Sequence, residues 1–185
     1  IRVQPVPCVG RCQHAPVAVV GQNPVGEATV EPVQQTVASG TTSPTLPDYQ
    51  TCAQYRASGG YQRYQECLAG KRTPETVIEE LKQAGLCGMG GAGFPASTKW
   101  EIVRGFPGPR LLALNIDEGE PGTFKDRFCM ETEPHRFLEG TLIAAWAVGI
   151  ESVYLYLRDE YAASREILTR ELKALQADPP GVLPD

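Results

Sequence analysis

The sequence lacks the features that mark several whole classes of protein. No apolar run approaches the roughly 20 residues that a membrane-spanning helix needs, and the most apolar segment is residues 141–150. There is no run of basic residues, and the formal net charge is −5, which argues against a nucleic-acid partner. We therefore expect no membrane span and no nucleic-acid interface.

The sequence also has too few cysteines for a disulfide scaffold. The six cysteines are unevenly spaced and do not form the pattern of a disulfide scaffold, so we expect reduced thiols. The expected location is cytoplasmic, with peripheral attachment to the inner membrane as the alternative. The chain has no initiator methionine and no signal peptide, and we expect it to be a fragment of a longer protein.

The composition along the chain predicts two structured parts. Residues 1–39 are expected to form a small unit, with strands at 1–7 and 16–20 and a short helix at 33–38. Residues 40–70 are expected to be a linker, because 40–48 are rich in Thr, Ser, Pro and Gly and the rest shows no strong periodicity. Residues 71–185 form the second predicted domain.

The second domain alternates between helical and strand patterns. Thr73 and Pro74 suit the start of a helix, as a hydroxyl N-cap followed by proline at the first helical position. The predicted elements are a helix at 74–84, a buried strand at 110–115, a helix from 133 to 149, a strand at 152–157 and a helix at 161–176. This alternation predicts an α/β domain with a mostly parallel sheet.

A glycine cluster follows the first of these helices. Gly88, Gly90 and Gly93 match the spacing of the dinucleotide-binding fingerprint, but that fingerprint needs a strand directly before it. Here a predicted helix leaves no room for a strand. A loop without a ligand remains an alternative, but we favour a nonstandard cofactor cradle, because bare backbone amides admit a planar or anionic ligand.

Polar residues gather where the two predicted strands end. Asp117, Glu118 and Glu120 follow the first strand, and they are too few and too closely spaced for a calcium loop. An acidic surface turn and a cation site are the plainer alternatives. Ligands of α/β sheets bind beyond the carboxyl ends of strands, so we expect this loop and the glycine loop to form opposite walls of a cofactor site.

Two cysteines near the start of the chain carry a weaker signal. Cys8 and Cys12 form a CxxxC pair, which is neither the redox CxxC motif nor a complete zinc site. The pair is either half of a four-cysteine cluster site or two ordinary thiols. His135 lies just inside a predicted helix, where packing or capping is its expected role.

Three motifs together resemble a known family. They are Gly85-Leu-Cys-Gly-Met-Gly-Gly-Ala-Gly-Phe-Pro95 with Lys99 and Trp100, Asn115-Ile-Asp-Glu-Gly-Glu-Pro-Gly-Thr-Phe-Lys-Asp-Arg127, and Tyr156-Leu-Arg-Asp-Glu-Tyr161. They resemble the flavin-bearing, NADH-oxidising subunit of respiratory complex I, NAD-reducing hydrogenases and NAD-dependent formate dehydrogenases. Residues 1–39 look like the second half of a thioredoxin-like [2Fe-2S] domain. The implied fold is a three-layer FMN-binding domain preceded by part of a thioredoxin-like α/β unit.

The resemblance implies roles for particular residues. FMN would be held by Gly88, Gly90, Gly91, Lys99, Asn115, Asp117 and Glu118. Phe94 would stack on the NADH adenine, Glu118 and Glu120 would seat the nicotinamide nucleotide as the catalytic pair, and Tyr156 and Glu160 would line the same cavity. A [4Fe-4S] cluster is expected beyond Asp185, and Cys8 and Cys12 would supply half of a [2Fe-2S] site in the full-length protein.

Having both parts on one chain resembles the formate dehydrogenase beta subunit most, with a complex I or hydrogenase subunit as the alternative. The implied partners are other subunits of a redox complex, such as a molybdenum formate dehydrogenase alpha subunit, and the fragment alone is expected to be inactive. Cys87 and Met89 replace the family's usual arginines, and Asp159 replaces a usual glycine. A rival hypothesis is therefore an electron-transfer or assembly module that has lost flavin.

Overall fold

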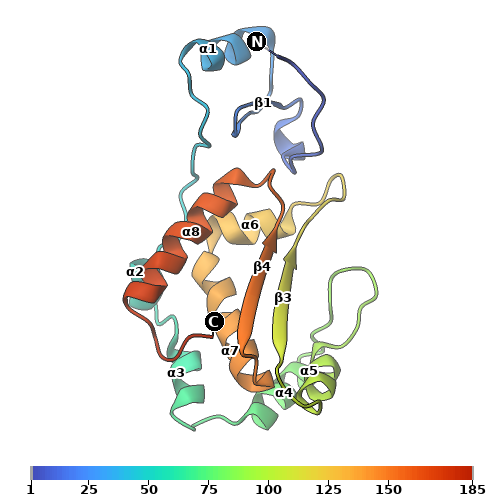
Figure 1. The fold of residues 1–185 in the computed structure, drawn as a ribbon, viewed down its shortest axis with the longest axis vertical. Coiled ribbons are helices and arrows are strands. Elements are labelled where there is room, and N and C mark those ends of the chain that lie inside the picture. The colour runs from blue at the N-terminus through green and yellow to red at the C-terminus, as the bar shows by residue number, and fades with distance from the viewer. Residues whose placement is uncertain (1, 185) are drawn as a thin grey trace. The chain divides into compact units, whose positions relative to one another are not determined.

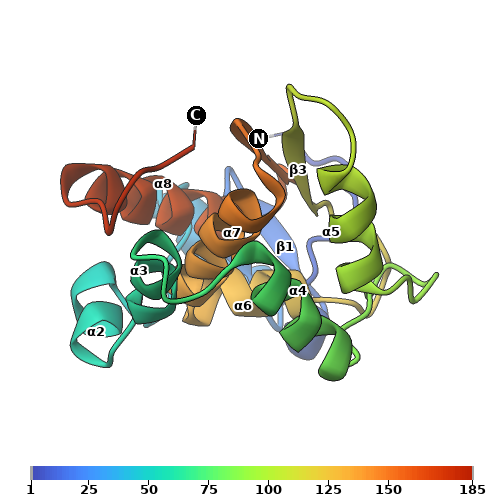
Figure 2. The ribbon, with the colours of Figure 1, turned by 90° about the horizontal axis from the view of Figure 1, so that it is seen from below.

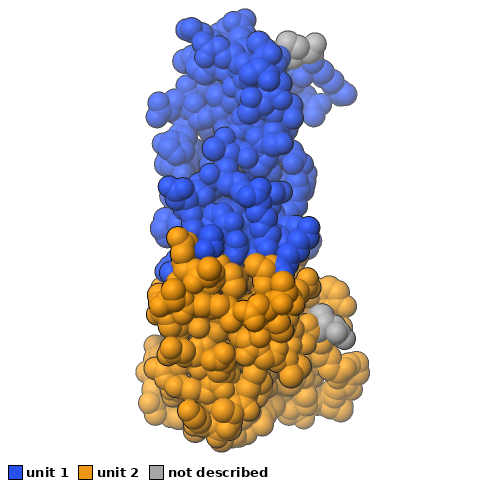
Figure 3. Space-filling model, turned by 90° about the vertical axis from the view of Figure 1, so that its left-hand side faces the viewer, with its two compact units in different colours: residues 1–51, 115–134, 156–173 blue, residues 52–114, 135–155, 174–185 orange. Residues whose placement is uncertain are grey.

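The computed structural model describes residues 2–184, which group into two compact units, each assembled from three stretches of chain. Unit 1 contains residues 1–51, 115–134 and 156–173, and unit 2 contains residues 52–114, 135–155 and 174–185 (Figure 3). Each unit has its own buried apolar residues, among them Ile116 and Ile167 in unit 1 and Ile78 and Leu142 in unit 2. None of the helices in the described chain combines the length and the apolarity needed to cross a bilayer.

The N-terminal part of unit 1 is a small hairpin with one helix. After the 3-10 turn η1 (Cys12–His14), strands β1 (Ala18–Val20) and β2 (Asn23–Val25) pair antiparallel, and α1 (Val30–Ala38) packs on them. The helix predicted at 33–38 is confirmed. The strand predicted at 1–7 is wrong for residues 2–7, which pair with no strand and leave Val3 91% exposed, while Ile1 lies outside the described residues.

Unit 2 begins with four helices, α2 (Cys52–Ala57), α3 (Gln62–Leu68), α4 (Pro74–Gln83) and α5 (Ala96–Arg104). The predicted start of α4 is confirmed, since Thr73 accepts a hydrogen bond from the Thr76 amide in a capping box. α4 packs against α5 (Figures 1 and 2). The expected linker at 40–70 contains the two short helices α2 and α3, and α5 was not predicted.

The α/β prediction is confirmed by the next elements along the chain. Strands β3 (Leu111–Ile116) and β4 (Ser152–Leu157) are neighbours in a parallel two-stranded sheet (Figure 1). Between them lie α6 (Lys125–Thr132) and α7 (Pro134–Val148), and α8 (Ala162–Ala177) follows β4. The prediction that 110–115 is buried is wrong, because Leu111, Ala113 and Asn115 are exposed on a face that the described residues leave open.

A buried polar cluster joins α3 to α7 inside unit 2. The Tyr61 hydroxyl and His135 Nδ1 are 2.6 Å apart, and His135 is fully buried, which confirms its expected packing role. The Glu139 carboxylate accepts hydrogen bonds from the backbone amides of Tyr61 (2.9 Å) and Tyr64 (3.2 Å). These amides lie at the start of α3, so Glu139 anchors that short helix to α7.

Candidate functional site

The glycine cluster forms an exposed loop that is closed only at its base. An antiparallel bridge joins Cys87 to Pro95, and the Gly88 amide donates to the Phe94 carbonyl at 2.9 Å. Gly91 and Gly93 have φ of 100° and 61°, in the region that favours glycine. A Cβ at Gly90, Gly91 or Gly93 would meet no heavy atom within 4 Å, so no side chain covers the loop within the described chain.

The loop leads directly into α5 and a shallow pocket. Phe94, Lys99, Ile102 and Val103 line this pocket, whose volume is about 420 Å³. Lys99, Ile102 and Val103 share one face of α5, because residues three and four apart are neighbours on a helix. An aromatic ring, aliphatic walls and one ammonium group suit a flat ligand with an anionic part.

The element before the loop decides between two interpretations of the glycine spacing. Helix α4 runs to Gln83, and residues 80–87 contain only the single bridge residue Cys87 rather than a strand. A Rossmann fingerprint requires a strand at this place. The Rossmann alternative is therefore wrong, as the sequence predicted.

The acidic loop begins where β3 ends in unit 1. Asn115 Oδ1 accepts a hydrogen bond from the Asp117 amide at 2.9 Å, which turns the chain sharply out of the strand. Asp117 and Glu120 are exposed, whereas Glu118 is only 5% exposed. Of the three acidic residues, two face solvent and one is part of the core.

The buried Glu118 carboxylate holds the start of α6. It accepts hydrogen bonds from the Asp126 amide (3.1 Å) and the Arg127 amide (3.4 Å), and also from Lys125 Nζ (3.2 Å) and the Tyr161 hydroxyl (3.1 Å). Burial opposes ionisation, but these donors outweigh it and lower the pKa of Glu118. The carboxylate therefore anchors the loop to α6 as a charged group.

Arg158 is buried beside Glu118 and contacts three separate segments. Its Nε donates to Glu160 Oε2 at 3.1 Å, its Nη1 donates to the Glu118 carbonyl, and its Nη2 donates to the Cys8 carbonyl at 2.5 Å. The ion pair with Arg158 lowers the pKa of Glu160. The guanidinium thus fixes Glu160, which follows β4, to the loop that follows β3.

The structure groups the predicted site residues by unit. Unit 1 contains Asn115, Asp117, Glu118, Glu120, Tyr156 and Glu160, and unit 2 contains Gly88, Gly90, Gly91, Phe94 and Lys99. Tyr156 is 61% exposed on β4. Each half is brought together within its own unit, while the expectation that the two loops are opposite walls of one site stays a prediction.

The cysteine pair does not make a cluster site by itself. Cys8 is half-buried, Cys12 is exposed, and both thiols are free. Among residues 2–184 there is no group of three or more side chains placed to hold a metal ion. A [2Fe-2S] cluster needs four protein ligands, so the described residues do not fit that group alone.

Several residues that shape the site were not assigned a role from sequence. They are Lys125, Arg127, Arg158 and Tyr161, which supply the donors around Glu118. Their signal is that basic residues lie close to acidic ones in two motifs, after them at Lys125 and Arg127 and before them at Arg158. From the sequence alone, that clustering is typical of an exposed charged surface. Only the burial of Glu118 in the structure shows that these residues are its donors.

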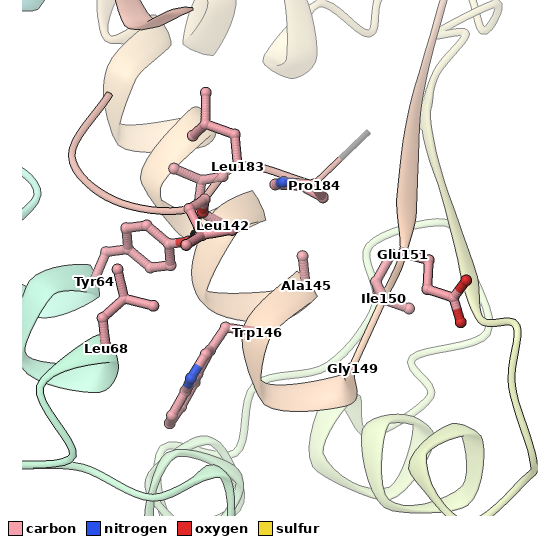
Figure 4. A pocket seen from close by; sticks show the side chains of 11 residues that line it. Tyr64, Leu68, Leu142, Ala145, Trp146, Gly149, Ile150, Glu151, Leu183 and Pro184 are labelled. Atoms are coloured by element: carbon pink, nitrogen blue, oxygen red, sulfur yellow. Dashed lines mark hydrogen bonds between the residues drawn. The ribbon is translucent and has the colours of Figure 1, made fainter. Parts of the chain in front are cut away.

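A larger apolar pocket lies elsewhere in unit 2 and contains none of the predicted site residues. Its volume is about 440 Å³, and Tyr64, Leu142 and Trp146 lie around it with the chain near Leu183 (Figure 4). Glu151 is the only acidic residue among the described residues that line it. Nothing in this pocket matches the motifs, so it is separate from the candidate site.

Curated relatives match about two thirds of the chain. An NADH-quinone oxidoreductase subunit of Rhizobium meliloti (strain 1021) is 45% identical over 120 residues, covering 64% of this chain and 28% of the relative. The corresponding NADH-quinone oxidoreductase subunit of Aquifex aeolicus (strain VF5) is 42% identical over 122 residues, covering 66% of this chain and 28% of the relative. The chain therefore spans little more than a quarter of the length of these relatives.

Solved structures match more of the chain. A chain in the crystal structure of an NAD+-reducing [NiFe]-hydrogenase in the air-oxidized state has a TM-score of 0.73 and 28% identity, covering 92% of this chain and 32% of that chain. The H2-reduced state matches with a TM-score of 0.69 over 94% of this chain and 33% of that chain. The Nuo51 FMN-binding domain family matches residues 81–179, more than half of the sequence and both strand-end motifs, and the chain belongs to this family.

Proposed function

We propose that the chain is the nucleotide-binding part of an FMN-dependent NADH:acceptor oxidoreductase of the complex I or NAD+-reducing hydrogenase type. The observation that carries the proposal is the open glycine loop beside the Phe94 and Lys99 pocket, inside the segment that matches an FMN-binding family. The relatives named above are quinone oxidoreductase and hydrogenase subunits. They support the alternative expectation better than the formate dehydrogenase assignment.

The glycine loop fits a flavin because its backbone is uncovered. Open space surrounds Gly90 and Gly91, so a flat ring could approach the chain as closely as backbone atoms allow. We assign Gly88, Gly90, Gly91 and Lys99 to FMN, with Asn115 and Asp117 from the other unit. Bound FMN would take a hydride from NADH and release single electrons.

The acidic residues that follow β3 and β4 would differ in role according to their exposure. Glu120 and Tyr156 are exposed and would contact the NADH nucleotide, together with Glu160, which Arg158 holds in place. Phe94 is 45% exposed and would stack on the adenine. The Glu118 carboxylate is already engaged with α6, so we propose that it positions the loop and supports Glu120 in seating the nicotinamide nucleotide.

The extent of the hydrogenase match supports a fused N-terminal unit. Coverage of 92% leaves about 15 of 185 residues unmatched, so part of residues 1–39 must lie within the match. The curated relatives cover only 64% to 66% of this chain. We propose that residues 1–39 are the C-terminal part of a thioredoxin-like domain, which packs within unit 1, and that the partners are other subunits of a redox complex.

The rival hypothesis of a flavin-free assembly module rested on three substitutions. Asp159 replaces a family glycine, yet the only non-glycine residues with positive φ within 2–184 are Glu27 and Tyr61. The Asp159 side chain is 84% exposed and pairs with Arg165, and Met89 is 77% exposed. Asp159 therefore strains no backbone. Cys87 and Met89 still remove the two positive charges of the family's arginines, and the flavin content of the purified protein decides between the two hypotheses.

An anaerobic titration of the complete, flavin-loaded protein with NADH tests the proposal. We expect the flavin absorbance to bleach as NADH is added, until excess NADH leaves the flavin reduced. A flavin that stays oxidised in excess NADH would contradict the assignment to an NADH-oxidising enzyme. The clusters, [4Fe-4S] and [2Fe-2S], stay proposals for the complete protein, where they would accept electrons from the reduced flavin.

A further inference from the structure

The cysteine-containing turn near the N-terminus packs directly on the acidic-loop network of unit 1. The Cys8 carbonyl accepts from Arg158 at 2.5 Å, and the Gly10 carbonyl accepts from Arg127 Nε at 3.1 Å. Arg11 also pairs with Glu131 at 3.5 Å. These contacts link residues that are more than a hundred positions apart in the sequence.

The two arginines that hold this turn also hold the acidic loop. Arg158 donates to the Glu118 carbonyl, and the Arg127 amide donates to the Glu118 carboxylate at 3.4 Å. Their side chains are only 6% and 7% exposed. A buried guanidinium that loses an acceptor is left with an unpaired charged donor, so each arginine couples the turn to the loop.

Gly10 allows the turn to approach this closely. It is buried with φ of 64°, and a Cβ there would lie 2.6 Å from the Tyr161 hydroxyl oxygen. The same hydroxyl donates to Glu118 Oε2 at 3.1 Å. Any side chain at position 10 would therefore displace either the turn or the tyrosine that contacts Glu118.

We propose that residues 8–11 position the Glu118 loop, and that Arg158 is the positioning residue that joins them. The inference rests on the proposed function, in which the Glu118 loop seats FMN and NADH. Release of the turn would let Arg158 and the loop adopt other arrangements, so substrate binding would weaken more than the chemical step. The N-terminal segment would thus be part of the nucleotide site although it contributes no ligand contact.

Hydrogen–deuterium exchange on the complete protein, without cofactors, tests the coupling directly. We expect Gly10→Ala to speed exchange of the amides at 117–120 and 126–127 about tenfold, because it displaces donors of charge-assisted hydrogen bonds. Gly40→Ala is the matched control, because Gly40 has φ of 65° but nothing within 4 Å of a Cβ. It carries the same backbone strain without the contact, and should leave these amides unchanged.

A second pair of variants tests the role of Arg158. Arg158→Gln should raise the KM for NADH about tenfold while kcat falls less than threefold, and Arg158→Lys should rescue only part of the loss because lysine lacks the planar fork. Arg165→Gln is the control, since its partner Asp159 is an exposed surface residue. It should leave both constants unchanged.

The outcomes separate this inference from the proposed function. If Gly10→Ala speeds amide exchange at residues 8–11 while the amides at 117–120 exchange as slowly as in the wild type, the positioning role is overturned. A loss confined to kcat, with no change in KM, for Arg158→Gln would also overturn it. Absence of flavin and NADH binding in the wild-type protein would contradict the proposed function, whereas the exchange experiment would still decide the coupling.

Discussion

The two loops assigned to the nucleotide site are constructed in opposite ways. The glycine loop is exposed, tied only at its base, and surrounded by open space at Gly90, Gly91 and Gly93. The acidic loop is fixed by buried Glu118 and by Arg158. The open loop can therefore take a ligand without losing protein contacts, while ligand contacts at the acidic loop are left to its exposed residues.

The largest expected effect comes from removing the anchor of the fixed loop. Glu118→Ala should lower the free energy of unfolding by about 3 kcal/mol, because it leaves buried donors unpaired. Urea unfolding followed by circular dichroism measures this change. Glu120→Ala, at an exposed position of the same loop, should change stability by less than about 0.5 kcal/mol. Equal effects of the two variants would show that Glu118 is no anchor.

Backbone conformation should matter more than packing in the open loop. Gly93→Ala should cost about 1 kcal/mol of stability, because φ of 61° is unfavourable for alanine. Gly90→Ala has the same open surroundings without positive φ, so its stability should not fall. Both variants should bind FMN more weakly if the ring lies on the loop, and calorimetric titration with FMN checks this. Unchanged affinity in both would contradict the cradle.

The charge beside the open loop should affect affinity rather than stability. Lys99→Ala should weaken FMN binding about fivefold, because an exposed ammonium contributes a modest charge-assisted contact. The effect should shrink at high salt. Lys82→Ala, on the exposed surface of α4, is the matched control and should bind FMN as the wild type does. If Lys99→Ala leaves the FMN affinity unchanged, or weakens it equally at low and high salt, Lys99 is not part of the FMN site.

The smallest expected effect is a pH dependence of the fixed loop. The pKa of Glu118 is lowered from 4.5 in the folded protein, so its stabilisation is complete above that value. It should be lost as the pH falls through the folded pKa. Comparing urea midpoints at neutral and acidic pH for the wild type and Glu118→Gln isolates this contribution. The wild type should lose more stability than the variant. Equal losses would show that ionisation of Glu118 does not contribute to stability.

Much of the fold could be predicted from residue patterns. Helix α4 has a clear hydroxyl cap and proline start, and β4 has the β-branched and aromatic residues of a strand, so their predicted limits agree with the structure within one residue. Helix α6 was missed because it carries little apolar periodicity. It depends instead on Glu118, which contacts its first-turn amides from outside the helix.

The site was predictable as a set of residues but not as a set of roles. The motifs identified the glycine loop and the strand ends, because clusters of glycine and of polar residues can be recognised in the sequence. The burial of Glu118 was not predictable, since three acidic residues in four resemble a solvated turn. The contacts of Arg158 with Cys8 were also hidden, because they join segments 150 positions apart.

The flavin content of the freshly purified complete protein shows whether the glycine loop holds FMN. We expect a yellow protein with a flavin absorption spectrum and one FMN released per chain on denaturation. If flavin is lost in purification, adding FMN should restore the spectrum with micromolar or tighter affinity. A colourless protein that takes up no FMN would contradict the assignment of the glycine loop as a flavin cradle.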